Sequence, residues 1–191
     1  HPCIAHFCGN NEVDVAFKNW GWQDKFGYST EFNQQLEMGY NILFRKNIRW
    51  KVEALAPHIS YVHTSPLSNW GKPENFNHSS MHYWGVWHGG ESFTEFENNV
   101  GRFMVEYGFQ SFPEVGVLSQ WIPDSLLNLV SEPMIDRQKS YIGNGMIKKH
   151  ADEMFGDSEN FMEFVGNSQK TQAKSMELAI KAHRKNTGPC M

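Results

Sequence analysis

Two glutamates stand at the ends of short apolar runs in this sequence. Glu12 follows the run 3–8, and Glu106 lies near the end of the run 102–107, which is rich in aromatic and β-branched residues. Runs of this length and composition are typical of buried β-strands. A carboxylate at the end of a buried strand costs free energy unless it is paired or put to use. An ion pair with Arg102 would explain Glu106 alone, but two carboxylates in equivalent positions favour a shared chemical role.

Paired carboxylates at strand ends can carry out glycoside hydrolysis. One carboxylic acid protonates the leaving oxygen, and the other carboxylate attacks the anomeric carbon or activates water. Asn11, directly before Glu12, supplies an amide that can hydrogen-bond a sugar hydroxyl. Trp20 follows in the next loop and is a candidate wall of the sugar pocket, because an aromatic face can stack on a pyranose. Packing beneath the loop is the alternative role for this side chain.

Three histidines, His78, His82 and His88, raise the alternative of a metal site. Their spacings of four and six residues match no zinc signature such as HExxH, and no cysteine lies near them in the sequence. We therefore predict that they hydrogen-bond sugar hydroxyls or hold the loop together. The predicted site uses no metal and no other cofactor.

The elements that must position these side chains alternate between strand and helix. Short apolar runs predict strands at 3–8, 60–64, 81–87 and 102–107. Apolar periodicity and capping patterns predict helices at 31–56, at 92–99, from 113 and, capped by Ser158, from 161 to Gly188-Pro189. The segment 124–155 is polar and predicts short helical pieces at most. This order is typical of an α/β domain with a parallel sheet.

The longest predicted connection is the segment 65–91, which is rich in Asn, Gly, His and Trp and contains the predicted strand 81–87. Connections of this length in a compact domain are usually functional or disordered. The aromatic residues of this segment argue against disorder, because disordered segments contain few of them. We therefore expect the segment to contribute to a binding site.

Composition limits the partners of this chain. It has 191 residues, enough for one domain with a sizeable core, and a net charge of -4. No nucleic-acid partner is expected from this charge, and no apolar stretch reaches the roughly 18 residues of a membrane helix. The aromatic share of 14%, with seven Trp, favours a carbohydrate or small-molecule site, although any one Trp can equally fill a core. Cys3, Cys8 and Cys190 form no CxxC pair, and we predict that Cys3 and Cys8 are buried small hydrophobes.

Several stretches of the chain resemble one enzyme family. Asn11-Glu12 after one strand, and Glu106-Tyr107-Gly108-Phe109-Gln110-Ser111 at the end of a later strand, resemble glycoside hydrolase family 2. The segments 64–71 and 81–89 are similar to the β-mannosidases of that family. The resemblance covers nearly the whole chain but only part of such an enzyme. It implies that residues 1–191 are the C-terminal half of a catalytic TIM (β/α)8 barrel, about strands four to seven with their helices. The flanking strands and the N-terminal β-sandwich domains of the family are then absent from this sequence.

The resemblance also implies a mechanism. Glu106 is the expected nucleophile and Glu12 the expected general acid/base of a retaining double displacement, which releases terminal β-D-mannosyl residues from mannosides, manno-oligosaccharides or glycoproteins. The expected substrate-binding residues are Asn11, Trp20, Trp70, Trp84 and His88. Of these, Asn11 would hold the 2-hydroxyl of the sugar, and His88 would lie near the nucleophile.

Other functions remain open at this stage. The β-galactosidases and β-glucuronidases of the same family share the Asn-Glu pair and the second glutamate, and galactoside is the second choice of sugar. A non-catalytic carbohydrate-binding protein could use the Trp-rich loop, but it would not need two glutamates at strand ends. The resemblance alone favours an extracytoplasmic or lysosomal location, and the sequence indicates no oligomeric state. Because half a barrel is expected, we predict that the chain alone is inactive.

Overall fold

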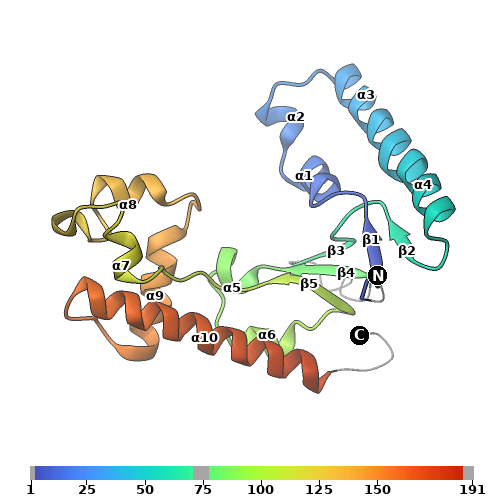
Figure 1. The fold of residues 1–191 in the computed structure, drawn as a ribbon. Coiled ribbons are helices and arrows are strands. Elements are labelled where there is room, and N and C mark those ends of the chain that lie inside the picture. Colours follow the sequence, from blue (N-terminus) through green and yellow to red (C-terminus); the bar gives the residue numbers. More distant parts are fainter. Residues whose placement is uncertain (1–2, 71–77, 187–191) are drawn as a thin grey trace. The chain divides into compact units, whose positions relative to one another are not determined.

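The computed structural model describes residues 3–70 and 78–186, which form two compact units (Figure 1). Unit 1 comprises residues 3–70, 78–82 and 101–105, and unit 2 comprises residues 83–100 and 106–186. Helices and short strands alternate along the chain, and the strands whose pairing is defined are parallel. The chain is therefore an α/β protein, as predicted, and its described strands form no closed barrel.

Unit 1 begins with a pair of parallel strands. β1 (His6–Cys8) pairs with β2 (Ser60–Val62), so the strands predicted at 3–8 and 60–64 are confirmed over their central residues. Gly9 follows β1 where the backbones approach closely, since a Cβ atom there would lie 2.6 Å from the His63 carbonyl oxygen. Cys3 and Cys8 are exposed, so the prediction that both are buried is wrong. Among the described residues β1 has a strand partner on one side only, and its side chains are incompletely covered.

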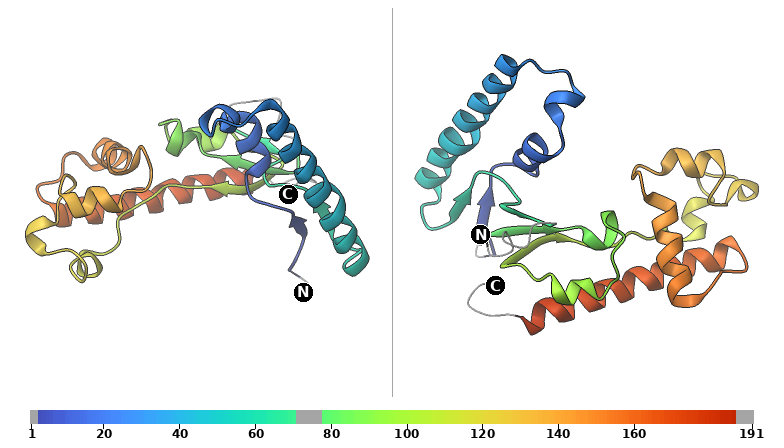
Figure 2. Two further views of the ribbon diagram at one scale, coloured as in Figure 1. Left: turned by 90° about the horizontal axis from the view of Figure 1, so that it is seen from above. Right: turned by 180° about the vertical axis from the view of Figure 1, so that it is seen from behind.

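A long helix follows in unit 1. It consists of α3 (Thr30–Tyr40), the π-helical segment η1 (Asn41–Asn47) and α4 (Ile48–Leu55), which form one continuous rod in Figures 1 and 2. The helix predicted at 31–56 is thus confirmed. The Ser29 hydroxyl caps it by accepting a hydrogen bond from the Phe32 amide at 3.2 Å. No residue of these three segments is buried in the part of the chain that the structure describes.

Two shorter helices, α1 (Val13–Asn19) and α2 (Trp22–Lys25), lie in the segment that was predicted to be a loop. The α1 helix starts directly after Glu12, so this glutamate lies at the junction of a strand region and a helix. The rings of Trp20 and Trp22 meet edge to face at 6.2 Å at the turn between the two helices. The helices were not predicted because they are short and their apolar residues show no clear period.

The second sheet has the order β3-β4-β5, formed by β3 (Ser68–Asn69), β4 (Ser80–Tyr83) and β5 (Phe103–Tyr107). The strand predicted at 102–107 is confirmed. The strand predicted at 81–87 ends at Tyr83, and its second half is the short helix α5 (Gly85–His88). A side chain at Gly85 would collide with the Glu91 carboxylate and lie 2.9 Å from the Tyr83 ring, so the close packing where the strand gives way to the helix requires glycine. Residues 71–77 of the predicted loop 65–91 lie outside the described residues.

Helices make up most of unit 2. Besides α5, they are α6 (Glu95–Asn98), α7 (Val115–Leu118), the 3-10 helix η3 (Asp124–Leu126), α8 (Glu132–Arg137), α9 (Gly143–Phe155) and α10 (Phe161–Lys185). The helix predicted at 92–99 is confirmed in part, and the one predicted from 113 is only four residues long. The prediction of short pieces over 124–155 is wrong for α9, which has 13 residues. No described helix combines the length and the apolar character needed to cross a membrane.

The α10 helix supplies one side of the core of unit 2. Its N-cap is Asn160, whose side chain accepts a hydrogen bond from the Glu163 amide at 3.0 Å. The predicted cap, Ser158, instead accepts a hydrogen bond from Asn167 at 3.2 Å, so that prediction is wrong. The predicted end of the helix at Gly188-Pro189 lies outside the described residues.

An aromatic cluster forms the centre of unit 2. The Phe93 ring stacks on His150 of α9 at 4.5 Å and meets Phe109 edge to face at 5.0 Å. Trp87 of α5 packs against Phe109 at 5.2 Å. All of these side chains are buried. The cluster joins α5, α9 and the segment after β5, so it fixes the chain on both sides of Glu106.

Candidate active site

Glu12 lies between β1 and α1 in a strained backbone conformation. Its φ of 59° and ψ of 2° are in the left-handed region, which costs a non-glycine residue about 1 kcal/mol or more. The Glu12 amide donates a hydrogen bond to the Ser65 carbonyl at 2.6 Å, and Asn11 forms a parallel bridge with Ser65. Ser65 thus fixes the backbone of both residues. The Asn11 side chain is exposed, and its contact with a sugar 2-hydroxyl stays a prediction.

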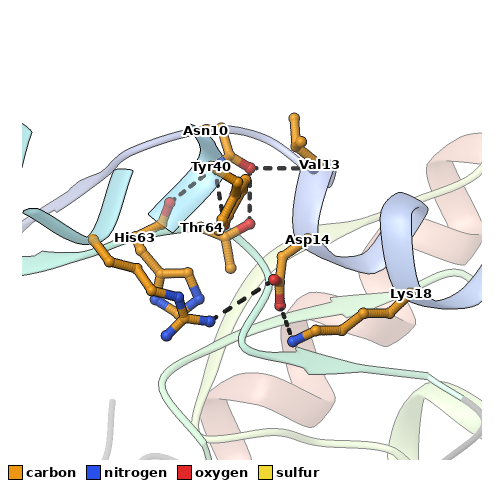
Figure 3. A network of polar contacts seen from close by, with 8 residues as sticks. Asn10, Val13, Asp14, Lys18, Tyr40, His63 and Thr64 are labelled. Atoms are coloured by element: carbon orange, nitrogen blue, oxygen red, sulfur yellow. Dashed lines mark hydrogen bonds and ion pairs between the residues drawn. The ribbon is translucent and has the colours of Figure 1, made fainter. Parts of the chain in front are cut away.

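Asn10 holds this junction together (Figure 3). Its amide oxygen accepts hydrogen bonds from the Val13 amide at 3.1 Å and from the Thr64 hydroxyl at 2.9 Å. Its amide nitrogen donates to the His63 carbonyl at 2.9 Å and to the Tyr40 hydroxyl at 3.2 Å. Asn10 therefore ties the start of α1 to the end of β2 and to α3. The sequence analysis missed this residue, because its partners are far away in the chain.

The carboxylate of Glu12 meets a buried histidine from β4. His82 Nδ1 lies 2.9 Å from Glu12 Oε1, and His82 Nε2 lies 2.9 Å from the Ser65 hydroxyl. The His82 side chain is 0% exposed, whereas that of Glu12 is 24% exposed and accessible to a ligand. Of the three histidines considered for a metal site, His82 therefore directs its ring nitrogens at the Glu12 carboxylate and the Ser65 hydroxyl. His78 is exposed, and the absence of a metal stays a prediction.

A charged cluster borders the start of α1. The Asp14 carboxylate accepts a hydrogen bond from Lys18 at 2.8 Å (Figure 3) and lies 3.8 Å from the Arg45 guanidinium. Both cations are exposed, so these pairs contribute at most about 1 kcal/mol. The three residues and Trp70 line a cavity of about 330 Å³ in unit 1. Trp70 thus faces a polar cavity, and its contact with a sugar stays a prediction.

In unit 2, Glu106 meets an indole from the end of β4. The Trp84 Nε1 donates a hydrogen bond to Glu106 Oε2 at 3.2 Å. The His88 ring packs edge to face on Trp84 at 5.9 Å and stacks on Tyr141 at 5.6 Å. The structure therefore brings Trp84 to Glu106 and His88 to Trp84, and the proximity of His88 to the nucleophile stays a prediction. Tyr141 is a neighbour that the sequence analysis missed, since it comes from a polar segment with no pattern of its own.

The segment that follows Glu106 is fixed by the polar side of α10. Gln172 donates a hydrogen bond to the Phe109 carbonyl at 2.6 Å and accepts one from the Ser111 hydroxyl at 2.8 Å. Beside this segment lies a cavity of about 480 Å³ in unit 2, which Trp84, Gln172 and Met176 help to line. Apolar walls with a few polar groups are typical of ligand sites.

Trp20 is the predicted site residue with the weakest support. Its side chain is 51% exposed, and its ring contacts Trp22 at the surface of unit 1. This placement fits an exposed stacking surface and equally a turn that two aromatic rings stabilise. Its role in a sugar pocket stays a prediction.

Comparisons with known proteins point to one kind of enzyme. No protein-family model matches the chain. Beta-mannosidase B of Aspergillus flavus is 24% identical over 194 residues, which cover 98% of this chain and 23% of that protein. Beta-mannosidase B of Thermothelomyces thermophilus is 31% identical over 134 residues, which cover 64% of this chain and 15% of that protein. The chain therefore spans less than a quarter of the length of these relatives.

A solved structure shares the fold. The β-D-mannosidase of Dictyoglomus thermophilum superposes with a TM-score of 0.80 and covers 98% of this chain, which corresponds to 22% of that protein. The sequences are 23% identical. The sequence and structure comparisons therefore agree over nearly the whole chain.

Proposed function

We propose that this chain is part of the catalytic domain of a retaining β-mannosidase of glycoside hydrolase family 2, on the basis of its similarity to β-mannosidases. The chain matches 23% of the length of Beta-mannosidase B of Aspergillus flavus. The proposed activity is therefore that of a full-length enzyme of which these 191 residues form one part. The substrate class is terminal β-D-mannosides.

The observation that carries the proposal is that each of the two glutamates is held by a hydrogen-bond partner from β4 or its end. Glu12 is held by His82 at 2.9 Å, and Glu106 is held by Trp84 at 3.2 Å. Oriented, partly exposed carboxylates at strand ends are suited to general acid/base and nucleophilic chemistry.

In the proposed mechanism the Glu106 carboxylate attacks the anomeric carbon and forms a glycosyl ester. The bond from the anomeric carbon to the leaving oxygen breaks, and the proton of Glu12 goes to that oxygen. Water then attacks the same carbon and gives a proton to Glu12, while the carboxylate of Glu106 departs. Two displacements at one carbon retain its configuration, and they require carboxyl groups about 5–5.5 Å apart.

The proposed architecture is the C-terminal half of a catalytic TIM barrel. In this proposal β1, β2, β4 and β5 are about strands four to seven, and residues 1–191 contribute to one domain with the remaining strands. The support is the shared fold with a β-D-mannosidase, together with exposed apolar side chains on the long helix of unit 1, such as Leu43 and Trp50. In a closed barrel the neighbouring elements would cover this surface.

The experiment that tests the function compares two alanine variants of the full-length enzyme on aryl β-mannosides. Glu106→Ala should abolish turnover, because no covalent intermediate can form. Glu12→Ala should slow substrates with poor leaving groups most, and added azide should restore part of its activity by replacing the water that the base activates. Turnover of β-galactosides or β-glucuronides with no turnover of β-mannosides would overturn the proposed substrate class.

A further inference from the structure

A closed ring of hydrogen bonds joins Glu12, Ser65 and His82 within unit 1. The Glu12 amide donates to the Ser65 carbonyl at 2.6 Å, the Ser65 hydroxyl meets His82 Nε2 at 2.9 Å, and His82 Nδ1 meets Glu12 Oε1 at 2.9 Å. We infer that His82, with its proton on Nδ1, is a positioning residue that confines the catalytic proton of Glu12 to Oε2. This inference rests on the proposed role of Glu12 as the general acid/base.

His82 is held rigidly enough to act in this way. It lies on β4, whose residues are all buried, and its own side chain is 0% exposed. Its carbonyl accepts a hydrogen bond from the Trp70 amide at 3.1 Å, and its position on β4 pairs with Asn69 on β3. The imidazole therefore has little freedom to turn away from Glu12. A side chain fixed by a strand can orient a reacting group more accurately than a side chain on a loop.

The hydrogen-bond partners of the His82 imidazole fix which of its nitrogens carries the proton. An ionised carboxylate has no proton to donate, so the Nδ1 that faces Glu12 must carry the proton. A neutral imidazole then has a lone pair on Nε2, which accepts a hydrogen bond from the Ser65 hydroxyl. Ser65 thus acts twice, since its carbonyl accepts the hydrogen bond of the Glu12 amide and its hydroxyl contacts the imidazole at Nε2. The arrangement resembles the way in which a third group orients a histidine in other enzymes.

This tautomer decides where the acid proton of Glu12 resides. The Nδ1–H group donates to Oε1, and a proton placed on that oxygen would face another proton. The acidic proton is therefore carried by Oε2 and can be delivered to the leaving oxygen of the substrate. In the second step His82 keeps donating to Oε1 while Oε2 accepts the proton of the attacking water. The histidine itself gains and loses no proton in either step.

The test measures how each variant of the full-length enzyme depends on the leaving group. Two substrates are compared by kcat/KM: 2,4-dinitrophenyl β-mannoside, which leaves without protonation, and an alkyl β-mannoside, which requires it. His82→Ala removes the imidazole that contacts Glu12, and Ser65→Ala removes the hydroxyl that contacts this imidazole. His82→Asn keeps an N–H donor near the position of Nδ1, and Ser65→Thr keeps the hydroxyl. His58→Ala, at an exposed position of unit 1 with no assigned role, is the matched control.

Both alanine variants should lose on the order of tenfold to a hundredfold in kcat/KM for the alkyl mannoside. The rate on the dinitrophenyl substrate should change only a few-fold. The variants His82→Asn, Ser65→Thr and His58→Ala should lie closer to the wild type on both substrates. Equal losses on the two substrates would indicate a structural role, and unchanged values on both would indicate no role. Either result would overturn the inference, while an inactive wild-type enzyme would overturn the proposed function instead.

A readout that needs no activity tests the tautomer directly. Ring-¹⁵N-histidine labelling of the full-length enzyme, with His82→Asn to assign the signal, reports which nitrogen of His82 carries the proton. The inference predicts that Nδ1 of His82 carries a proton, and the Ser65→Ala variant should keep it there because the Glu12 carboxylate still faces this nitrogen. A ring protonated on Nε2 alone at neutral pH would contradict it whatever the activity.

Discussion

The long helices of the two units differ in what packs against them. In unit 1, no residue of α3, η1 or α4 is buried within the described chain. Even an apolar side chain such as that of Leu43 is 46% exposed. In unit 2, α10 buries one whole face, and its polar side chains bind the segment after Glu106. Both helices are capped by a side chain at the first turn. Capping therefore does not distinguish the two helices, whereas the neighbours that pack against them do.

This contrast separates a unit with its own core from one that exposes part of its apolar surface. Burial of apolar surface contributes roughly 25 cal/mol per Å², so a long helix that buries none of its residues gains little from packing. In the proposed barrel, other parts of the enzyme cover the helix of unit 1. Unit 2 should then behave as the stable part of this chain, and unit 1 as the part that depends on its surroundings.

The largest expected effect concerns activity. Residues 1–191 expressed alone should show no hydrolysis of an aryl β-mannoside above background, although both glutamates are present. An incomplete sheet leaves open edges, and a catalytic group misplaced by about 1 Å can cost on the order of a hundredfold in rate. Steady-state assay of the purified chain is the measurement. Turnover that disappears on Glu106→Ala would show that residues 1–191 are sufficient for catalysis. Unit 1 would then not depend on other parts of the enzyme.

A smaller effect separates the two helices by mutation. Phe164→Ala removes a buried ring from α10 and should destabilise unit 2 by about 3–5 kcal/mol. Leu43→Ala changes an exposed side chain and should stay within about 0.5 kcal/mol in the isolated chain. Hydrogen exchange followed by mass spectrometry reports the first value on the α10 amides and the second on the amides of the long helix of unit 1. Equal effects of the two variants would contradict the contrast between the helices.

The smallest predicted effect is a pH dependence of unit 2. Burial lowers the pKa of His183, whose ring meets Tyr107 edge to face at 4.4 Å. The unfolded chain then binds a proton at a higher pH than the folded chain does. The stabilising contribution is present above about pH 6.5 and is lost as the pH falls below that value towards the folded-state pKa.

Replacement of this histidine should weaken the pH dependence. His183→Leu should reduce the fall in Tm between pH 7.5 and 5.5, while His58→Leu, at an exposed position in unit 1, should leave it unchanged. His150 is buried as well, and its lowered pKa should preserve part of the dependence. A fall in Tm that is identical in all three proteins would exclude a contribution from His183.

The sequence predicted the elements whose signal is local. The apolar runs around Phe7, Tyr61 and Met104 became β1, β2 and β5, and the spacing of apolar residues from Phe32 to Ile48 became the long helix. These signals are strong because strand and helix periods differ clearly. The α9 helix was missed because Gly143 and Gly145 lower its helix propensity, while burial of Ile147 and Ala151 in the tertiary structure outweighs this cost.

The candidate site could be predicted only in part. Glu12 and Glu106 stood out because a carboxylate after an apolar run is unusual. Their partners are separated from them by 70 and 22 residues in the chain, so no local pattern identifies the contacts of His82 with Glu12 or of Trp84 with Glu106. Similarly, the change from strand to helix at Gly85 depends on its contacts with Tyr83 and Glu91, which only the folded chain creates.

The most direct test of the central claim identifies the nucleophile. The full-length enzyme is treated with a 2-deoxy-2-fluoro-β-mannosyl fluoride, which forms the glycosyl ester quickly and hydrolyses it slowly. Proteolysis and mass spectrometry then locate the label on the polypeptide. The account predicts one fluoromannosyl group per active site, on Glu106, and none in the Glu106→Ala variant. A label on Glu12, or inactivation without any label on the segment 103–107, would contradict it.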